Sequence, residues 1–202
     1  LPVGPTIFGD SPYQPSSGCA GNIYFIDLDK LVDEGLLEKE EILEYNWGTD
    51  ESEIDYAALH QNRCRILQKA FERFDTNAQE FQDFVKKQSE WLEQYALFMT
   101  LKTDNLYKNW SEWPSEYRNP QTVALEKYQK KNYNTITFWE FCQYKFFEQW
   151  EDLKNYANSK GIYIIGDISF YVGYDSVDVW AERQLFMMSA NDTPEYLSLI
   201  HI

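Results

Sequence analysis

Apolar residues recur every three or four positions along most of the chain, which is the spacing of amphipathic helices. The clearest such stretches are residues 56–74, 78–101 and 137–160. A further helical region begins near Thr122. Thr137 and Glu140 have the spacing of a capping box, and Gly161 supplies a C-terminal stop. We therefore expect the last of these helices to begin at about Thr137 and to end just before Gly161.

The segment after the last predicted helix has a different pattern. Residues 161–168 (GIYIIGDI) are a continuous apolar run that ends in Gly-Asp, which is typical of a strand buried in a parallel sheet. A helix, a glycine and a buried strand in this order form an α/β unit. Asp167 lies at the carboxyl end of this strand, where barrel enzymes carry their functional residues. An aspartate here can equally cap a following helix or loop.

The first 21 residues are dense in glycine, proline and serine, which predicts a long irregular loop. An aromatic residue in such a loop, such as Phe8 or Tyr13, has no helix face to bury it. These two residues are therefore candidate platforms for a sugar ring or another flat apolar ligand. Trp110 and Trp113, in a second connection at about 105–120, are expected instead to pack onto the helices.

A polar cluster near the C-terminal end allows two interpretations. Asp175, Ser176, Asp178 and Trp180 lie in YVGYDSVDVW, where they form either part of a site or the N-cap and first turn of a helix. Serine and aspartate are preferred residues at helix N-caps, so we favour the structural interpretation.

Composition narrows the function classes. Hydrophobic residues make up 44% of the 202 residues, as in a globular protein, and the aromatic excess of 17% is expected to lie mostly in the core. The net charge of −15 repels phosphate backbones and anionic lipids, so neither nucleic acid nor a membrane is an expected partner. Cys19, Cys64 and Cys142 are far apart and odd in number, which favours reduced thiols in a cytoplasmic protein.

Several common catalytic and cofactor motifs are missing. The chain has two histidines, His60 and His201, and no Gly-x-Ser-x-Gly elbow, so a serine or cysteine hydrolase has little support. It has neither a Walker A motif nor a dinucleotide-binding glycine pattern. His60 and Cys64 have the spacing of a metal pair on a helix, but the other cysteines are isolated from them. We therefore expect no cofactor and no metal site.

Two long motifs carry a family resemblance. The loop LPVGPTIFGDSPYQPSSGCAGN and the segment IIGDISFYVGYDSVDVWA together closely resemble the 4-alpha-glucanotransferases, also called amylomaltases or disproportionating enzymes, of glycoside hydrolase family 77. The intervening pieces NIYFIDLDKLVDEGLL, WLEQYALFMTLK and FCQYKFFEQWEDLKNYANSKGIYIIGD resemble the same family in the same order. The resemblance therefore covers nearly the whole chain.

The resemblance implies an α/β fold, namely a partial TIM (β/α)8 barrel of the alpha-amylase clan with a large helical insertion. Residues 1–21 would form a barrel strand end and a substrate-site loop, and residues 22–160 a mainly helical insertion with a barrel helix. Residues 161–194 would form the next barrel strand and its loop. Residues 195–202 depart from the family's pattern, and we expect them to be a non-native end.

The resemblance also implies a cytoplasmic enzyme without a cofactor. Such an enzyme transfers segments of maltooligosaccharides or alpha-1,4-glucans to the 4-hydroxyl of glucose or another glucan by a retaining double displacement. Its catalytic carboxylates come from later barrel strands, so we expect none within this chain and no activity from the chain alone. Two alternatives stay open: a non-catalytic acidic helical module that binds a glucan or a protein, and a related clan member that hydrolyses glucans.

Five residues are expected at the substrate site by the same resemblance. Tyr13 would stack on a sugar in the donor site, and Asp167 would hydrogen-bond sugar hydroxyls near the scissile bond. Asp10 and Ser11 would shape the loop that carries Tyr13. Phe8 stands where family members often carry tyrosine, so a contact made by that hydroxyl is absent here.

Overall fold

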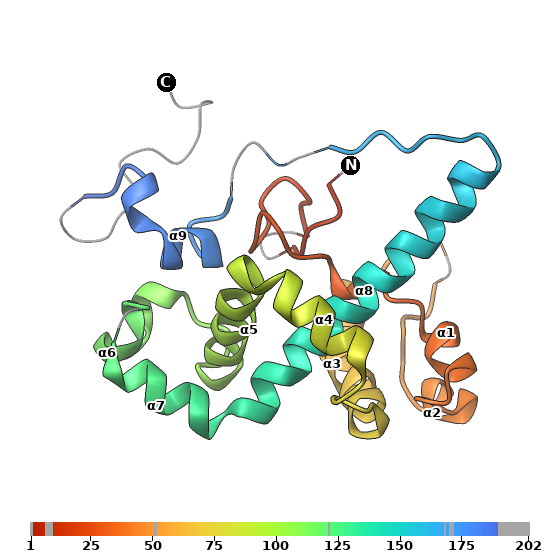
Figure 1. Ribbon diagram of the computed structural model, residues 1–202, viewed down its shortest axis with the longest axis horizontal. Coiled ribbons are helices and arrows are strands. Elements are labelled where there is room, and N and C mark those ends of the chain that lie inside the picture. Colours follow the sequence, from red (N-terminus) through yellow and green to blue (C-terminus); the bar gives the residue numbers. More distant parts are fainter. Residues whose placement is uncertain are drawn as a thin grey trace. The chain divides into compact units, whose positions relative to one another are not determined.

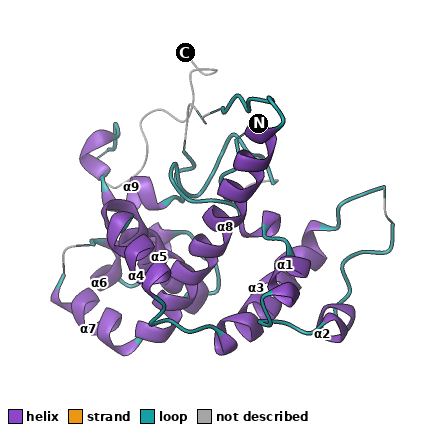
Figure 2. Ribbon diagram, turned by 45° about the vertical axis from the view of Figure 1, so that its right-hand side comes forward, coloured by secondary structure: helices purple, strands orange, loops and turns teal. Residues whose placement is uncertain are grey.

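The chain divides into two compact units. A computed structural model describes residues 2–6, 10–50, 52–120, 122–167, 169 and 172–189. Unit 1 consists of residues 1–21, 87–140 and 165–202, and unit 2 consists of residues 22–86 and 141–164. Within the described residues every regular element is a helix (Figures 1 and 2). None of these helices is long and apolar enough to cross a membrane.

Unit 2 is built from helices around a cluster of aromatic rings. Its elements are η1 (Ile23–Phe25), α1 (Leu28–Asp33), α2 (Lys39–Leu43), α3 (Tyr56–Arg73), α4 (Gln79–Lys87, all but its last residue) and the later part of α8 (Tyr133–Ser159). The ring of Phe74, just after α3, lies 4.8 Å from that of Phe141 on α8 and 5.3 Å from that of Phe81 on α4, measured between centroids. The aromatic excess of the sequence is thus partly core packing, as expected.

Polar contacts in unit 2 join α1 to α8. The Asp27 N–H, at the N-cap of α1, donates to Gln149 Oε1 at 2.7 Å, and Gln149 Nε2 donates to the Asp27 carbonyl at 3.1 Å. The buried ammonium of Lys145 pairs with Glu34 at 2.6 Å and with Glu148 at 2.8 Å. Since a buried charge is costly without a partner, these carboxylates allow Lys145 to lie in the interior.

Unit 1 has its own aromatic core. Its elements are α5 (Ser89–Asp104), η2 (Trp110–Glu112), α6 (Ser115–Arg118), α7 (Val123–Lys131), the start of α8, α9 (Val177–Ala181) and η3 (Arg183–Leu185). Phe98, Trp113 and Trp180 are fully buried, and their ring centroids lie 5.3 to 6.1 Å apart. Trp110 is also fully buried, so both tryptophans of the connection at 105–120 pack inward as predicted.

Several helix boundaries agree with the sequence pattern. Helices α3 and α7 confirm the predictions for 56–74 and for the region beginning at Thr122, whose side chain caps α7 by accepting from the Leu125 N–H. Gly161 ends α8 with a φ of 75°, a conformation that glycine adopts without strain. The Ile162 N–H reaches back to the Ala157 carbonyl at 3.0 Å, which satisfies one of the last carbonyls of the helix.

Two predicted helix boundaries are wrong. The stretch 78–101 forms two helices, because Gln88 leaves the helical conformation and its carbonyl accepts from Trp91 and Leu92 at the start of α5. Thr137 is not an N-cap, since α8 begins four residues earlier at Tyr133. The Thr137 hydroxyl instead donates to the Tyr133 carbonyl at 3.0 Å, which lets threonine sit within a helix.

Residues 161–168, predicted as a buried strand, form no strand in their described part. Residues 162–167 are in neither a helix nor a strand, and they are exposed, Ile165 to 94%. An apolar run is buried as a strand only when neighbouring strands pair with it and helices cover its faces. The described residues provide no such neighbours.

The ring cluster of unit 2 gives a test of packing. We expect Phe141→Ala to lower the free energy of unfolding by about 3–5 kcal/mol, because the removed ring leaves a cavity among Phe71, Phe74 and their neighbours. Tyr156→Ala, on the exposed side of the same helix, should change it by less than about 0.5 kcal/mol. Urea unfolding of the 202-residue chain measures both, and equal effects would contradict this assignment of the core.

Glu140 makes the stability of unit 1 depend on pH. Burial, with a smaller contribution from Glu93, raises the pKa of Glu140 to about 7. The folded state therefore keeps a proton that the unfolded state releases near pH 4.5, so this group makes stability fall as the pH rises from about 4.5 to about 7. We compare the free energy of unfolding of Glu140→Gln with that of the unmodified chain. This difference should be about 1–2 kcal/mol more favourable to the variant at pH 8 than at pH 4, a figure reduced for the partial exposure of Glu140.

Thermal unfolding of the 202-residue chain at pH 4 and pH 8 measures this difference. Glu151→Gln, which alters an exposed carboxylate on the same helix, serves as the control and should show no comparable difference between the two pH values. If Glu140→Gln and Glu151→Gln behave alike, Glu140 does not titrate as described.

Candidate functional site

The N-terminal loop is folded back on itself. Thr6 and Pro15 form an isolated antiparallel bridge, and the Ser16 N–H donates to the Pro5 carbonyl at 2.9 Å. Within this closure, the residues from Asp10 to Gln14 form a turn. The prediction of an irregular loop is confirmed for the described part of residues 1–21.

The loop is attached to a segment more than 150 residues later in the chain. Three hydrogen bonds join them: from Ser169 Oγ to the Pro12 carbonyl (2.9 Å), from the Gly173 N–H to the Pro15 carbonyl (3.1 Å) and from the Val177 N–H to the Ser16 carbonyl (2.9 Å). The loop and residues 169–178 both belong to unit 1, so these bonds fix one local arrangement.

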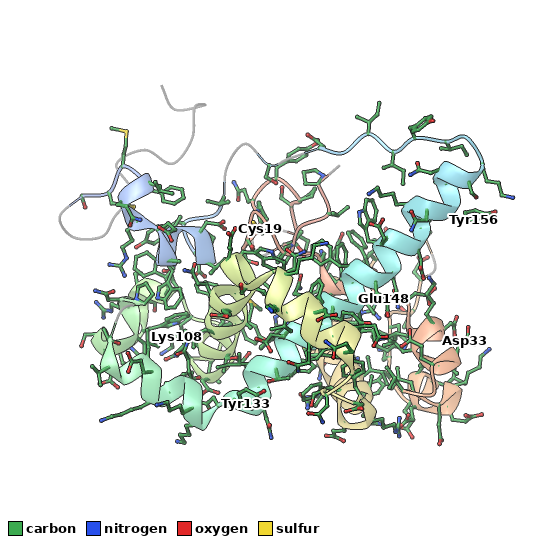
Figure 3. The ribbon with its side chains drawn as sticks, in the orientation of Figure 1. Cys19, Asp33, Lys108, Tyr133, Glu148 and Tyr156 are labelled. Atoms are coloured by element: carbon green, nitrogen blue, oxygen red, sulfur yellow. The ribbon has the colours of Figure 1, made fainter. Side chains whose placement is uncertain are left out.

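Asp178 adds a fourth attachment. Its carboxylate oxygens accept from the Gly18 N–H at 3.1 and 3.3 Å. Burial raises the pKa of Asp178, while the hydrogen bond from Gly18 acts in the opposite direction. Cys19, the residue after Gly18, is labelled in Figure 3 and marks this end of the loop.

Tyr13 lies at the open side of the loop. It is 44% exposed, and its N–H donates to Ser11 Oγ at 3.3 Å. The Gln14 N–H donates to the Ser11 carbonyl at 3.3 Å, so Ser11 holds the turn with both its side chain and its backbone. Tyr13 therefore presents an accessible ring from a turn of defined geometry.

Asp10 has an unusual backbone conformation. Its φ of 51° lies in the left-handed region, which aspartate tolerates better than most residues. Its carboxylate accepts from Thr6 Oγ1 at 3.3 Å, a contact across the base of the loop. Asp10 thus acts within the loop, which fits its predicted part in shaping it.

Asp167 is exposed and lies two residues before Ser169. The Ser169 hydroxyl donates to the Pro12 carbonyl, next to Tyr13 in the chain. That Tyr13 and Asp167 act at one site remains a prediction. Phe8, the remaining predicted site residue, lies outside the described residues.

The polar cluster at 175–180 has the structural role that we favoured. Ser176 caps α9, its hydroxyl accepting from the Val179 N–H at 3.3 Å, and Trp180 is fully buried. Asp175 is buried and forms an ion pair with Lys102. Sequence reasoning did not find this partner, although a lysine at the end of the run YALFMTLK, directly after apolar residues, is a signal that a buried charge needs a counter-ion.

This arrangement is suited to binding a sugar. An exposed aromatic ring stacks on the apolar face of a pyranose, and a carboxylate accepts hydrogen bonds from its hydroxyls.

Over the described part of the chain no three His, Cys, Asp or Glu side chains gather as metal ligands do, and no disulfide is formed.

Comparison with known proteins gives consistent matches. The family model for glycoside hydrolase family 77, described as 4-alpha-glucanotransferase, matches residues 1–196. The 4-alpha-glucanotransferase of Clostridium butyricum is 40% identical over 190 residues, which cover 94% of this chain and 39% of that protein. That of Streptococcus pneumoniae serotype 4 is 42% identical over 196 residues, which cover 95% of this chain and 38% of that protein.

A solved structure agrees with these sequence matches. The amylomaltase from Streptococcus agalactiae in complex with acarbose superposes with a TM-score of 0.89 at 38% identity, over 96% of this chain and 40% of that one. This neighbour supports the α/β class predicted from the sequence, whereas the partial barrel remains a prediction. The chain spans about two fifths of the length of the curated relatives it matches. With a family match over residues 1–196, the chain belongs to glycoside hydrolase family 77, the 4-alpha-glucanotransferases.

Proposed function

We propose that this chain is part of a 4-alpha-glucanotransferase that transfers alpha-1,4-glucan segments to the 4-hydroxyl of glucose or another glucan. The observation that carries the proposal is the family match over residues 1–196, together with relatives of that name at 40–42% identity. Because the chain spans about two fifths of those relatives, the activity belongs to a longer protein that contains it. We place this protein in the cytoplasm, with maltooligosaccharides as its substrates.

The proposed reaction is a retaining double displacement. A carboxylate attacks the anomeric carbon to give a glycosyl-enzyme, while a second carboxyl protonates the leaving 4-oxygen and then deprotonates the acceptor hydroxyl. Both carboxylates would come from strands beyond this chain. Transfer prevails over hydrolysis when the acceptor sugar is held and water is kept out.

Within this reaction the loop residues would bind the donor glucan. Tyr13 would stack on a glucose ring, and its 44% exposure leaves the ring face accessible. Asp167 would accept hydrogen bonds from sugar hydroxyls, and its own exposure supports this role. Ser11 and Asp10 would keep Tyr13 in place through the turn contacts. Phe8 would add an apolar contact without a hydroxyl.

The exposed run at 162–165 supports a partial barrel. These residues are apolar, yet exposed in the described chain. In a longer protein, neighbouring barrel strands would satisfy their backbone groups and helices would cover their side chains. We therefore propose residues 161–168 as a barrel strand, residues 1–21 as a strand end with its loop, and residues 22–160 as mainly a helical insertion. Residues 161–194 as a whole would form this strand and its following loop.

A first test compares two proteins. The full product of the encoding gene should convert maltotriose into glucose and longer maltodextrins, whereas the 202-residue chain should not, because it lacks the catalytic carboxylates. Chromatography of the products measures this. Release of glucose without longer products would favour a glucan hydrolase. A well-folded 202-residue chain that binds maltodextrin, from a gene product that transforms nothing, would favour a non-catalytic binding module.

A second test addresses the loop residues in the full gene product. Tyr13→Ala should lower kcat/KM on maltotriose about 10-fold or more, and Tyr13→Phe should lower it much less, because the ring face is what stacks. Asp167→Asn should lower it about 10- to 100-fold, through the loss of charge-assisted hydrogen bonds.

The matched controls are Tyr133→Ala and Asp33→Asn, which alter an exposed tyrosine and an exposed aspartate elsewhere on the surface (Figure 3). Both should leave kcat/KM within about twofold of the unmodified enzyme. Site variants that are no worse than these controls would remove Tyr13 and Asp167 from the substrate site.

A further inference from the structure

Lys102 lies near the end of α5 with its charge buried. Only 4% of its side chain is exposed, and 5% of that of Asp175, with which it forms an ion pair. The ammonium also donates to the Lys108 carbonyl at 2.9 Å and to the Tyr107 carbonyl at 3.3 Å. These three bonds use all the donors of a lysine.

The turn that supplies the two carbonyls is strained. Leu106 and Tyr107 have φ values of 55° and 58°, in the left-handed region that bulky residues rarely adopt. In this conformation the consecutive carbonyls of Tyr107 and Lys108 both accept from the Lys102 ammonium. Lys108 is labelled in Figure 3. Strained backbone persists where the surroundings fix it, and here the bonds to the buried ammonium act beside the bond from the Tyr107 N–H to the Lys102 carbonyl at 2.7 Å.

Asp175 connects the cation to the rest of unit 1. Its second carboxylate oxygen accepts from the Trp110 N–H at 3.1 Å, and the Trp110 indole N–H donates to the Tyr174 carbonyl at 2.7 Å. Tyr174 and Asp175 therefore attach the segment 173–178 to α5 and η2. Their neighbours Gly173, Val177 and Asp178 bind the N-terminal loop.

The segment 173–178 is thus held between two partners. On one side it is bonded to the buried ammonium and to Trp110, and on the other to Pro15, Ser16 and Gly18. Tyr13 lies two residues before the first of these loop contacts. These bonds connect the backbone that follows Tyr13 to the Lys102–Asp175 pair.

We infer that Lys102 and Asp175 are positioning residues for the glucan-binding loop, acting on the sugar through Tyr13 without touching it. This inference rests on the proposed function, because it concerns the same loop. It predicts that a change at Lys102 and a change at Tyr13 affect catalysis in a coupled way, since each disturbs the same contact.

A double-mutant cycle in the full gene product tests the coupling. Lys102→Met should lower kcat/KM on maltotriose about 10-fold or more when Tyr13 is present. In the Tyr13→Ala background the same change should cost less than about threefold, because the stacking contact is already lost. Rates are compared at a temperature at which circular dichroism shows every variant folded.

Lys145→Met is the matched control. Lys145 is as buried as Lys102 and is likewise paired with carboxylates, but its partners Glu34 and Glu148 belong to unit 2. Its effect on kcat/KM should be equal in the two Tyr13 backgrounds. If Lys102→Met also shows equal losses in both backgrounds, Lys102 stabilises the fold without positioning the loop. Should Lys102→Met not fold, Asp175→Asn, which keeps an acceptor but loses the charge, enters the same cycle.

Hydrogen exchange gives a readout that needs no substrate. In Lys102→Met the peptides that contain the amides of Ser16, Gly18, Gly173 and Val177 should exchange faster, and in Lys145→Met they should not. Unchanged exchange at these amides in Lys102→Met would overturn the inference even if the enzyme acts on glucans. A gene product inactive on maltotriose with the expected exchange would instead contradict the proposed function and leave the positioning of the loop supported.

Discussion

The burial of one ammonium group sets the arrangement of unit 1. Removing a lysine charge from water costs several kcal/mol unless each of its donors finds an acceptor. Lys102 finds Asp175 and two carbonyls, and the chain adopts left-handed backbone at Leu106 and Tyr107 to supply them. The end of α5, the turn after it and the segment at 173–178 therefore have one compatible geometry, and the N-terminal loop is bonded to that segment.

The aromatic residues stabilise the fold by forming a core in each of the two units. Phe98, Trp113 and Trp180 fill unit 1, whereas Phe74, Phe81 and Phe141 fill unit 2. Buried indole N–H groups need acceptors, and Trp113 and Trp180 donate to the carbonyls of Lys108 and Tyr117. The Lys108 carbonyl thus accepts both from a core indole and from the buried ammonium, so the same turn contributes to the aromatic core and to the charged cluster.

The N-terminal loop combines exposure with attachment. Tyr13 reaches solvent, yet the backbone that follows it is hydrogen-bonded to Gly173 and to Val177 of α9. In the proposed function, a ring held in this way would lose little conformational freedom when a sugar stacks on it, which would favour binding. The apolar run at 162–165 is exposed in the described residues; in the proposed barrel, neighbouring strands would cover it.

Local signals in the sequence determined several helices and some of their ends. Periodicity located α3 and α8, Thr122 and Gly161 marked two boundaries, and the cluster at 175–180 favoured a helix start, because each depends on residues within one or two turns. The two motifs at the ends of the chain were enough to indicate the family. Other features depended on the presence or absence of distant partners: the exposure of residues 162–167 and the pairing of Lys102 with Asp175. Only the tertiary structure decides these, because burial and ion pairing arise between segments that the chain brings together after folding.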